Sequence, residues 1–255
     1  MKNTLNNIFD FKNNLVSPSI IVGVSIILFA LVVYLSVGDF VNKENNITVA
    51  GTAEKIVTSD AGKMTIYLSE RVYGEGVSVT ASKISNTSAQ KVVTYLKNAG
   101  FTETEVEVGN VSLAPICELS SQGYENCSIG IKGQTGSITV TVNSKNIDLV
   151  KNVGAKIVSE IFGVNITNVS VEYLYNGLKD IRVQMLTEAT KNAKERAEAV
   201  AKAGGSSVGS ITSLSSGVFQ VTAPNSVQVD DYGAYDTSTI EKKVTAVVKA
   251  NFSIR

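Results

Sequence analysis

The stretch Ile147–Tyr173, IDLVKNVGAKIVSEIFGVNITNVSVEY, combines the pattern of a helix with that of a strand. Its first part carries apolar residues at helical spacing, namely Leu149, Val150, Val153, Ile157 and Ile161. Gly163 follows where a helix would end, and the β-branched residues after it predict a strand over 166–173. A helix that leads within a few residues into a strand indicates a mixed α+β fold.

The same patterns extend in both directions from this stretch. Strands are expected at Ile47–Ala53, Lys63–Ser69, Val106–Leu113, Ile138–Val142, Val208–Val221 and Ile240–Ile254. Helices are expected at Ala81–Asn98, with Gly100 as the C-cap, and at Leu178–Ala203. We interpret the glycine-rich residues 130–136 as a hairpin turn. The predicted order is ββαββαβαββ, in one domain over 47–255 that is compatible with two packed subdomains.

The amino-terminal part contains an apolar run. No residue from Val16 to Gly38 is charged, and about 20 apolar residues in a helix suffice to cross a bilayer. We expect residues 16–38 to be a single transmembrane signal anchor, after a cytoplasmic tail of residues 1–15 and before a linker at 39–46. Lys2 and Lys12 before the run give a weak positive-inside bias. The carboxy-terminal domain is then extracytoplasmic, in the periplasm or at the cell surface.

A cleaved signal peptide is the alternative, with the small residues Ser36-Val37-Gly38 as its cleavage site. The apolar core of a signal peptide is typically about 7–15 residues long. The run in this chain is longer, which favours the anchor.

The two cysteines, Cys117 and Cys127, are separated by polar, turn-like residues. They cannot complete a four-ligand zinc site, and their spacing is not that of a CxxC redox motif. An even number of cysteines in an extracytoplasmic domain favours a disulfide that closes a small loop. Two unpaired thiols are the alternative.

Composition excludes several classes of function. The chain has no His, so it contains no His-dependent triad and no HExxH zinc site. Lys plus Arg equals Asp plus Glu, which argues against nucleic acid as a partner. The carboxylates of Asp230, Asp231 and Asp236 could ligate calcium, but their spacing is not that of an EF-hand, and we interpret them as a solvated acidic loop. We identify no catalytic, cofactor-binding or metal-binding residues.

Several stretches resemble the SIMPL-domain family, which includes bacterial periplasmic immunogenic proteins and proteins labelled as oxidative-stress defence. They are residues 47–54, 97–101, 173–193, 204–209, 217–220 and 239–248. The family often has a Pro-Asp pair where this chain has Ser59-Asp60, and the two cysteines are not a general family feature. The resemblance covers residues 47–255 and implies an α+β fold, a tendency to form ring- or channel-like oligomers, and no catalytic residues.

These observations lead to a functional hypothesis. We expect a non-enzymatic, membrane-anchored envelope protein without a cofactor, whose domain self-associates as a homo-oligomeric scaffold or stress-protective assembly. The alternative is an envelope module that binds a small ligand or a partner protein.

Overall fold

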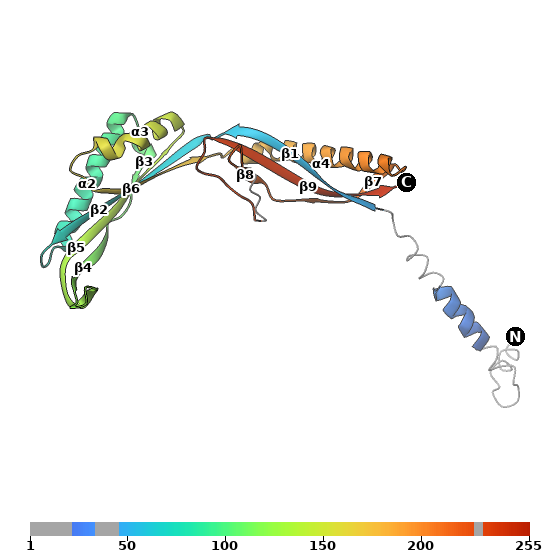
Figure 1. The fold of residues 1–255 in the computed structure, drawn as a ribbon, viewed down its shortest axis with the longest axis horizontal. Helices are drawn as coiled ribbons and strands as arrows, with labels where there is room; N and C mark the ends of the chain where they lie inside the picture. Colours follow the sequence, from blue (N-terminus) through green and yellow to red (C-terminus); the bar gives the residue numbers. More distant parts are fainter. Residues whose placement is uncertain (1–21, 34–45, 227–231) are drawn as a thin grey trace, which may run out of the picture. The chain divides into compact units, whose positions relative to one another are not determined.

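The computed structural model describes residues 22–33, 46–226 and 232–255. They form a mixed helix and sheet fold, as predicted. The chain divides into a larger compact unit, Val49–Arg196 with Leu214–Ala250, and a smaller one that includes Ala197–Ser213 and Asn251–Arg255. Figure 1 labels the helices and strands.

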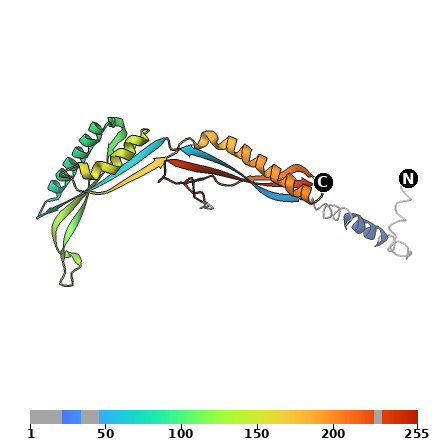
Figure 2. The ribbon, with the colours of Figure 1, turned by 45° about the horizontal axis from the view of Figure 1, so that its top comes forward.

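One sheet has five antiparallel strands in the order β3-β5-β2-β6, and β4 pairs with β5. The strands are β2 (Ala61–Tyr73), β3 (Val106–Val108), β4 (Ser112–Leu119), β5 (Glu125–Ser144) and β6 (Ile166–Leu174). Helices α2 (Ser78–Ala99) and α3 (Ile147–Glu160) lie together over one face of this sheet (Figures 1 and 2).

The core of this part is formed by alternate residues of the central strands. Met64, Ile66 and Leu68 of β2 are buried, and their register partners on β5 are buried apolar residues too. The helices contribute Val92, Leu96, Val150 and Ile157. Each such side chain stabilises the fold by about 1.5–3 kcal/mol when it leaves water. The alternating apolar residues of β2 and the helically spaced apolar residues of α3 therefore belong to one buried core.

The helix ends follow from local sequence. Gly100 has a φ of 112°, and its N–H bonds back to the carbonyls of Leu96 and Lys97. The predicted C-cap is confirmed, because glycine takes this left-handed conformation without a steric penalty. At the start of α3, Asn146 accepts a hydrogen bond from the N–H of Leu149 at 3.0 Å.

The prediction of a hairpin turn at residues 130–136 was wrong. These residues lie inside β5, and the turn is at 120–124, where the Ser120 N–H bonds to the Tyr124 carbonyl at 2.8 Å. A Cβ at Gly133 would meet the backbone of Val72 on β2. A Cβ at Gly136 would lie 3.0 Å from the Ala81 carbonyl oxygen of α2. The glycines therefore allow β2 and α2 to approach β5 closely.

Two predicted strands are each divided in the structure. The region 106–113 contains β3 and the start of β4, separated by residues 109–111, and both strands pair with β5. The region 208–221 contains β7 (Val208–Ser216) and β8 (Gln220–Thr222). The observed order is therefore ββαβββαβαβββ. In each region the two strands pair with different parts of one longer strand, β5 for β3 and β4, and β9 for β7 and β8. The local sequence does not show where one pairing ends and the next begins.

The second sheet has the order β1-β9-β7, and β8 also pairs with β9. Its long strands are β1 (Asn46–Thr58) and β9 (Glu241–Ile254). Helix α4 (Leu178–Ala203) buries a stripe of mostly small residues, namely Met185, Ala189, Ala193, Ala197 and Ala201. A Cβ at Gly51 of β1 would collide with the backbone of Ala189 and Ala193, so the absence of a side chain at Gly51 permits this close packing.

Residues 22–33 form a helix. Within the described ranges, no helix is long and apolar enough to cross a membrane. Most of the amino-terminal predictions lie outside the described residues: the tail at 1–15, residues 16–21 and 34–38 of the predicted anchor, and residues 39–45 of the linker.

Candidate functional site

The predicted disulfide between Cys117 and Cys127 is present, and it joins β4 to β5. Cys117 lies opposite Ile131 in the strand register, and the next residue, Glu118, lies opposite Asn126. Residues 127–130 of β5 therefore have no register partner on β4 and form a bulge. The disulfide links Cys127, the first residue of this bulge, to β4 and so constrains the conformation of residues 127–130.

The disulfide lies in a two-stranded extension of the sheet. The pairing of β2 with β5 ends at Tyr73 and Gly133. Before Gly133, β5 is paired with β4 alone, through Glu125, Asn126 and Ile131. We call residues 117–131 the β4–β5 arm; Figure 1 shows the two strands continuing together to their turn. A two-stranded ribbon has no core of its own and is marginally stable in water. The arm therefore depends on the covalent cross-link, on outside contacts or on both.

The β4–β5 arm exposes large apolar side chains. The exposed fractions are 55% for Leu119, 73% for Tyr124, 59% for Ile129 and 49% for Ile131. Single exposed apolar residues are ordinary on protein surfaces. Several of them on one short ribbon are typical of a surface that contacts another molecule.

Among the described residues, the charged side chain that is fully buried is that of Lys242, on β9. Its side chain has no solvent exposure. Its Nζ donates hydrogen bonds to the backbone carbonyls of Asp236 and Thr239, each at 2.6 Å, and lies 3.2 Å from Oδ2 of Asp236. An ammonium group in an apolar interior requires such partners.

The carboxylate of Asp236 is fully engaged by its neighbours. The N–H and hydroxyl groups of Ser238 and Thr239 donate to it, as does Lys242. Burial by itself raises the pKa of Asp236, but these hydrogen bonds outweigh burial and hold the pKa well below its usual range. The carboxylate therefore stays ionised and acts as a structural acceptor.

The loop that contains Asp236 is bonded to distant segments. The Tyr173 N–H donates to the Thr237 carbonyl at 2.7 Å, and the Ser59 N–H donates to the Ile240 carbonyl at 2.8 Å. The Tyr235 hydroxyl accepts from the Tyr175 N–H at 2.9 Å and donates to the Tyr175 carbonyl at 2.8 Å. The ion pair of Asp236 and Lys242 therefore stabilises a loop that is hydrogen-bonded to Ser59, Tyr173 and Tyr175. These contacts are those of a structural cluster.

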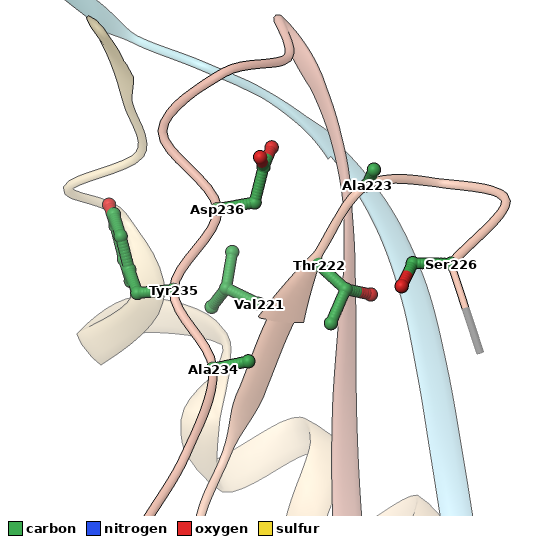
Figure 3. Close-up of a pocket in the computed structure, with 7 residues that line it drawn as sticks. All are labelled: Val221, Thr222, Ala223, Ser226, Ala234, Tyr235 and Asp236. Atoms are coloured by element: carbon green, nitrogen blue, oxygen red, sulfur yellow. The ribbon is translucent and has the colours of Figure 1, made fainter. Parts of the chain in front are cut away.

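A cavity of about 310 Å³ lies beside this loop. Figure 3 shows the residues that line it: Val221, Thr222, Ala223, Ser226, Ala234, Tyr235 and Asp236. Thr222 is 6% exposed, and its buried hydroxyl has no hydrogen-bond partner. A buried hydroxyl without a partner is costly, so a bound water or ligand in this cavity would stabilise it.

The acidic loop predicted at 230–236 is only partly described. Asp230 and Asp231 lie outside the described residues, and Asp236 is not the solvated carboxylate that we expected. Among the residues that the structure describes, no group of three or more His, Cys, Asp or Glu could hold a metal ion. The interpretation of Asp236 was wrong because its donors lie beyond it in the sequence, at Ser238, Thr239 and Lys242.

Sequence reasoning did not single out Lys242, although a signal for it exists. β9 buries every second residue, namely Val244, Ala246, Val248, Ala250 and Phe252. Lys242 occupies the next position in this inward series. A lysine at an inward position of an alternating strand predicts a buried charge, and the partner of such a charge must be nearby.

Two antiparallel sheets with helices define an α+β domain. A family model described as SIMPL, protein of unknown function (DUF541), matches residues 47–252. The chain belongs to this family, as the resemblance predicted. No curated protein matches the chain.

Proposed function

We propose that this chain is a non-enzymatic, membrane-anchored envelope protein whose SIMPL domain self-assembles into an oligomeric scaffold or stress-protective assembly. The observation that carries self-assembly is the β4–β5 arm, with Leu119, Tyr124, Ile129 and Ile131 exposed on a two-stranded ribbon. Contact with another subunit would remove these side chains from water and would stabilise a ribbon that lacks a core.

The non-enzymatic part of the proposal is supported by the state of Asp236. General acid–base catalysis needs a titratable group whose pKa is near the working pH and whose proton a substrate can reach. Asp236 has a depressed pKa, and its carboxylate is surrounded by donors from its own loop. A structural role therefore explains this group better than a catalytic role.

The anchored part of the proposal is supported by the uncharged run 16–38. Its described portion, residues 22–33, is helical, and nearly all of its side chains are exposed. An extracytoplasmic position is supported by the disulfide of Cys117 and Cys127, because disulfides persist in oxidising compartments.

Membrane fractionation of bacteria that express the full chain tests the location. The chain should stay with the membrane pellet after alkaline carbonate extraction, and protease added to spheroplasts should digest its carboxy-terminal domain. A mature protein that begins at Asp39 would replace the anchor with a cleaved signal peptide. Protection from the protease would contradict the extracytoplasmic location.

Light scattering of the full chain in detergent, at micromolar concentration, tests self-assembly. We expect a defined oligomer mass after correction for bound detergent. The matched variants are Ile129→Asn on the arm and Val158→Asn on α3, which replace two side chains of nearly equal exposure, 59% and 60%. Only the arm variant should lower the mass, and a monomer at all concentrations would contradict the proposal.

A ligand-binding module is the second candidate, and the observation in its favour is the unpartnered hydroxyl of Thr222 beside the cavity. Native mass spectrometry of the purified chain is the test. A bound small molecule should appear as added mass, and Thr222→Val should remove it while keeping the side-chain shape. Absence of any added mass in the wild type would count against this candidate.

A further inference from the structure

The outward face of α4 carries a shallow apolar groove. Val183, Leu186, Thr187 and Thr190 line it, and its volume is about 330 Å³. These residues are spaced three and four positions apart, so they lie on one side of the helix. Val183 and Thr187 are exposed, whereas Leu186 is half-buried and packs against the buried cluster of Ala53, Ala189 and Val248. Val183 is 74% exposed. The groove is thus an apolar surface on a regular helix, where a polar face is usual.

Basic residues lie at both ends of this groove. Lys179 is one helical turn before Val183, and Lys194 is one turn after Thr190, on the same face and both exposed. Lys194 also interacts with another group of its own chain. The only acid within the span of the groove is Glu188, which accepts a hydrogen bond from the Gln184 side chain at 2.9 Å on the neighbouring flank. The surroundings of the groove therefore favour a partner with acidic residues beside an apolar centre.

The β4–β5 arm has this complementary chemistry. Its apolar side chains lie beside two exposed acidic residues, Glu118 and Glu125, close to the turn. The groove from Val183 to Thr190 covers about 10 Å of helix, at 1.5 Å per residue. Two paired strands, about 4.8 Å apart, fit across that length with their side chains.

We infer that the β4–β5 arm of one subunit docks into the α4 groove of a second copy of this chain. The inference rests on the proposed self-assembly and assigns the two surfaces that meet. Ile129, held in the bulge by the disulfide, contacts Val183, while Glu118 and Glu125 lie near Lys179 and Lys194. The contact joins two different surfaces, so it is heterologous, and its repetition gives a closed ring or an open chain of subunits.

Directed cross-linking between co-expressed, differently tagged full-length chains tests this pairing. One chain carries Ile129→Cys and the other carries Val183→Cys. Val158→Cys, on the exposed surface of α3, replaces Val183→Cys as the control. We expect a non-reducible bis-maleimide with a short spacer to link Ile129→Cys to Val183→Cys at least tenfold more than to Val158→Cys. Circular dichroism checks that each variant is folded.

The outcomes separate the inference from the proposed function. Equal cross-linking of Ile129→Cys chains to one another would overturn the inference in favour of an arm-to-arm contact. An oligomer by light scattering without the cross-link from Ile129→Cys to Val183→Cys would also overturn it, while self-assembly would stand. A monomer by light scattering would overturn self-assembly and the inference together.

A charge exchange gives an independent check on the same pairing. Glu118→Lys with Glu125→Lys should reduce the oligomer fraction at low salt, and Lys179→Glu with Lys194→Glu in the same chain should restore it. Because exposed charges are screened by salt, the loss should become smaller at 1 M NaCl. A loss that the lysine replacements do not restore would overturn the pairing.

Discussion

The ammonium group of Lys242 lies 3.2 Å from Oδ2 of Asp236, and the lysine side chain has no exposure to solvent. Two backbone carbonyls, of Asp236 and Thr239, complete its hydrogen bonds at 2.6 Å each. Removal of one partner of a buried ion pair leaves the other partner uncompensated, and this costs far more than the loss of a surface pair.

Replacement of Lys242 by Met should therefore destabilise the domain by about 3–5 kcal/mol. The matched control is Lys63→Met, which removes a surface ion pair with Glu172 at 3.4 Å and should cost about 0–1 kcal/mol. Urea unfolding of the full chain in detergent, followed by circular dichroism, measures both free energies. Equal effects of the two substitutions would contradict the structural role of Lys242.

The depressed pKa of Asp236 predicts a dependence of stability on pH. The folded state holds this carboxyl ionised at a pH where the unfolded chain protonates it, at about 4. The stabilisation from Asp236 is then complete above that pH and is lost as the pH falls toward the folded-state pKa. Between about pH 5 and pH 2, the free energy of unfolding of the wild type should fall more steeply than that of Asp236→Asn. Parallel pH profiles would contradict the assignment.

The contact of Gly51 with α4 predicts a steric effect. A Cβ at this position would overlap the carbonyl oxygen of Ala189 and the backbone nitrogen of Ala193, and backbone atoms cannot move aside as a side chain can. Gly51→Ala should therefore cost about 1–3 kcal/mol. The control is Gly204→Ala, where the nearest atom to a new Cβ is 3.5 Å away. Thermal unfolding of both variants should show a lower midpoint for Gly51→Ala alone.

The disulfide predicts separate effects on stability and assembly. In the chain-entropy model, a loop of this length contributes about 3 kcal/mol. Because the loop lies in the β4–β5 arm, Cys117→Ser with Cys127→Ser should reduce the oligomer mass while α2 and α3 stay folded. Light scattering and circular dichroism measure the two effects. A free-thiol assay on the denatured wild type should find no reactive thiol, and two reactive thiols would exclude the bond.

The β4–β5 arm and the buried ion pair were only partly predictable from the sequence. The pairing of Cys117 with Cys127 followed from their number and spacing together with the expected compartment. The exposure of Ile129 did not, because the pairing of β4 with β5 and the end of β2 decide it. Lys242 could have been found from the alternation of β9, but its partners Asp236 and Thr239 are on a loop whose path local sequence does not specify.

The sequence by itself determined the helices to within a few residues, since helical spacing and a C-cap such as Gly100 act over a short stretch of chain. Two of their ends differ, because α2 begins at Ser78 and not at Ala81, and α3 ends at Glu160, before Gly163. The sequence also determined the α+β class and the family. Only the tertiary structure decided that the glycine-rich residues 130–136 extend a strand, that β3 and β4 are separate, and that Lys242 is buried. In each case the deciding contact comes from a segment distant in the chain. Strand pairing and burial depend on such contacts, whereas a helix makes its hydrogen bonds within itself.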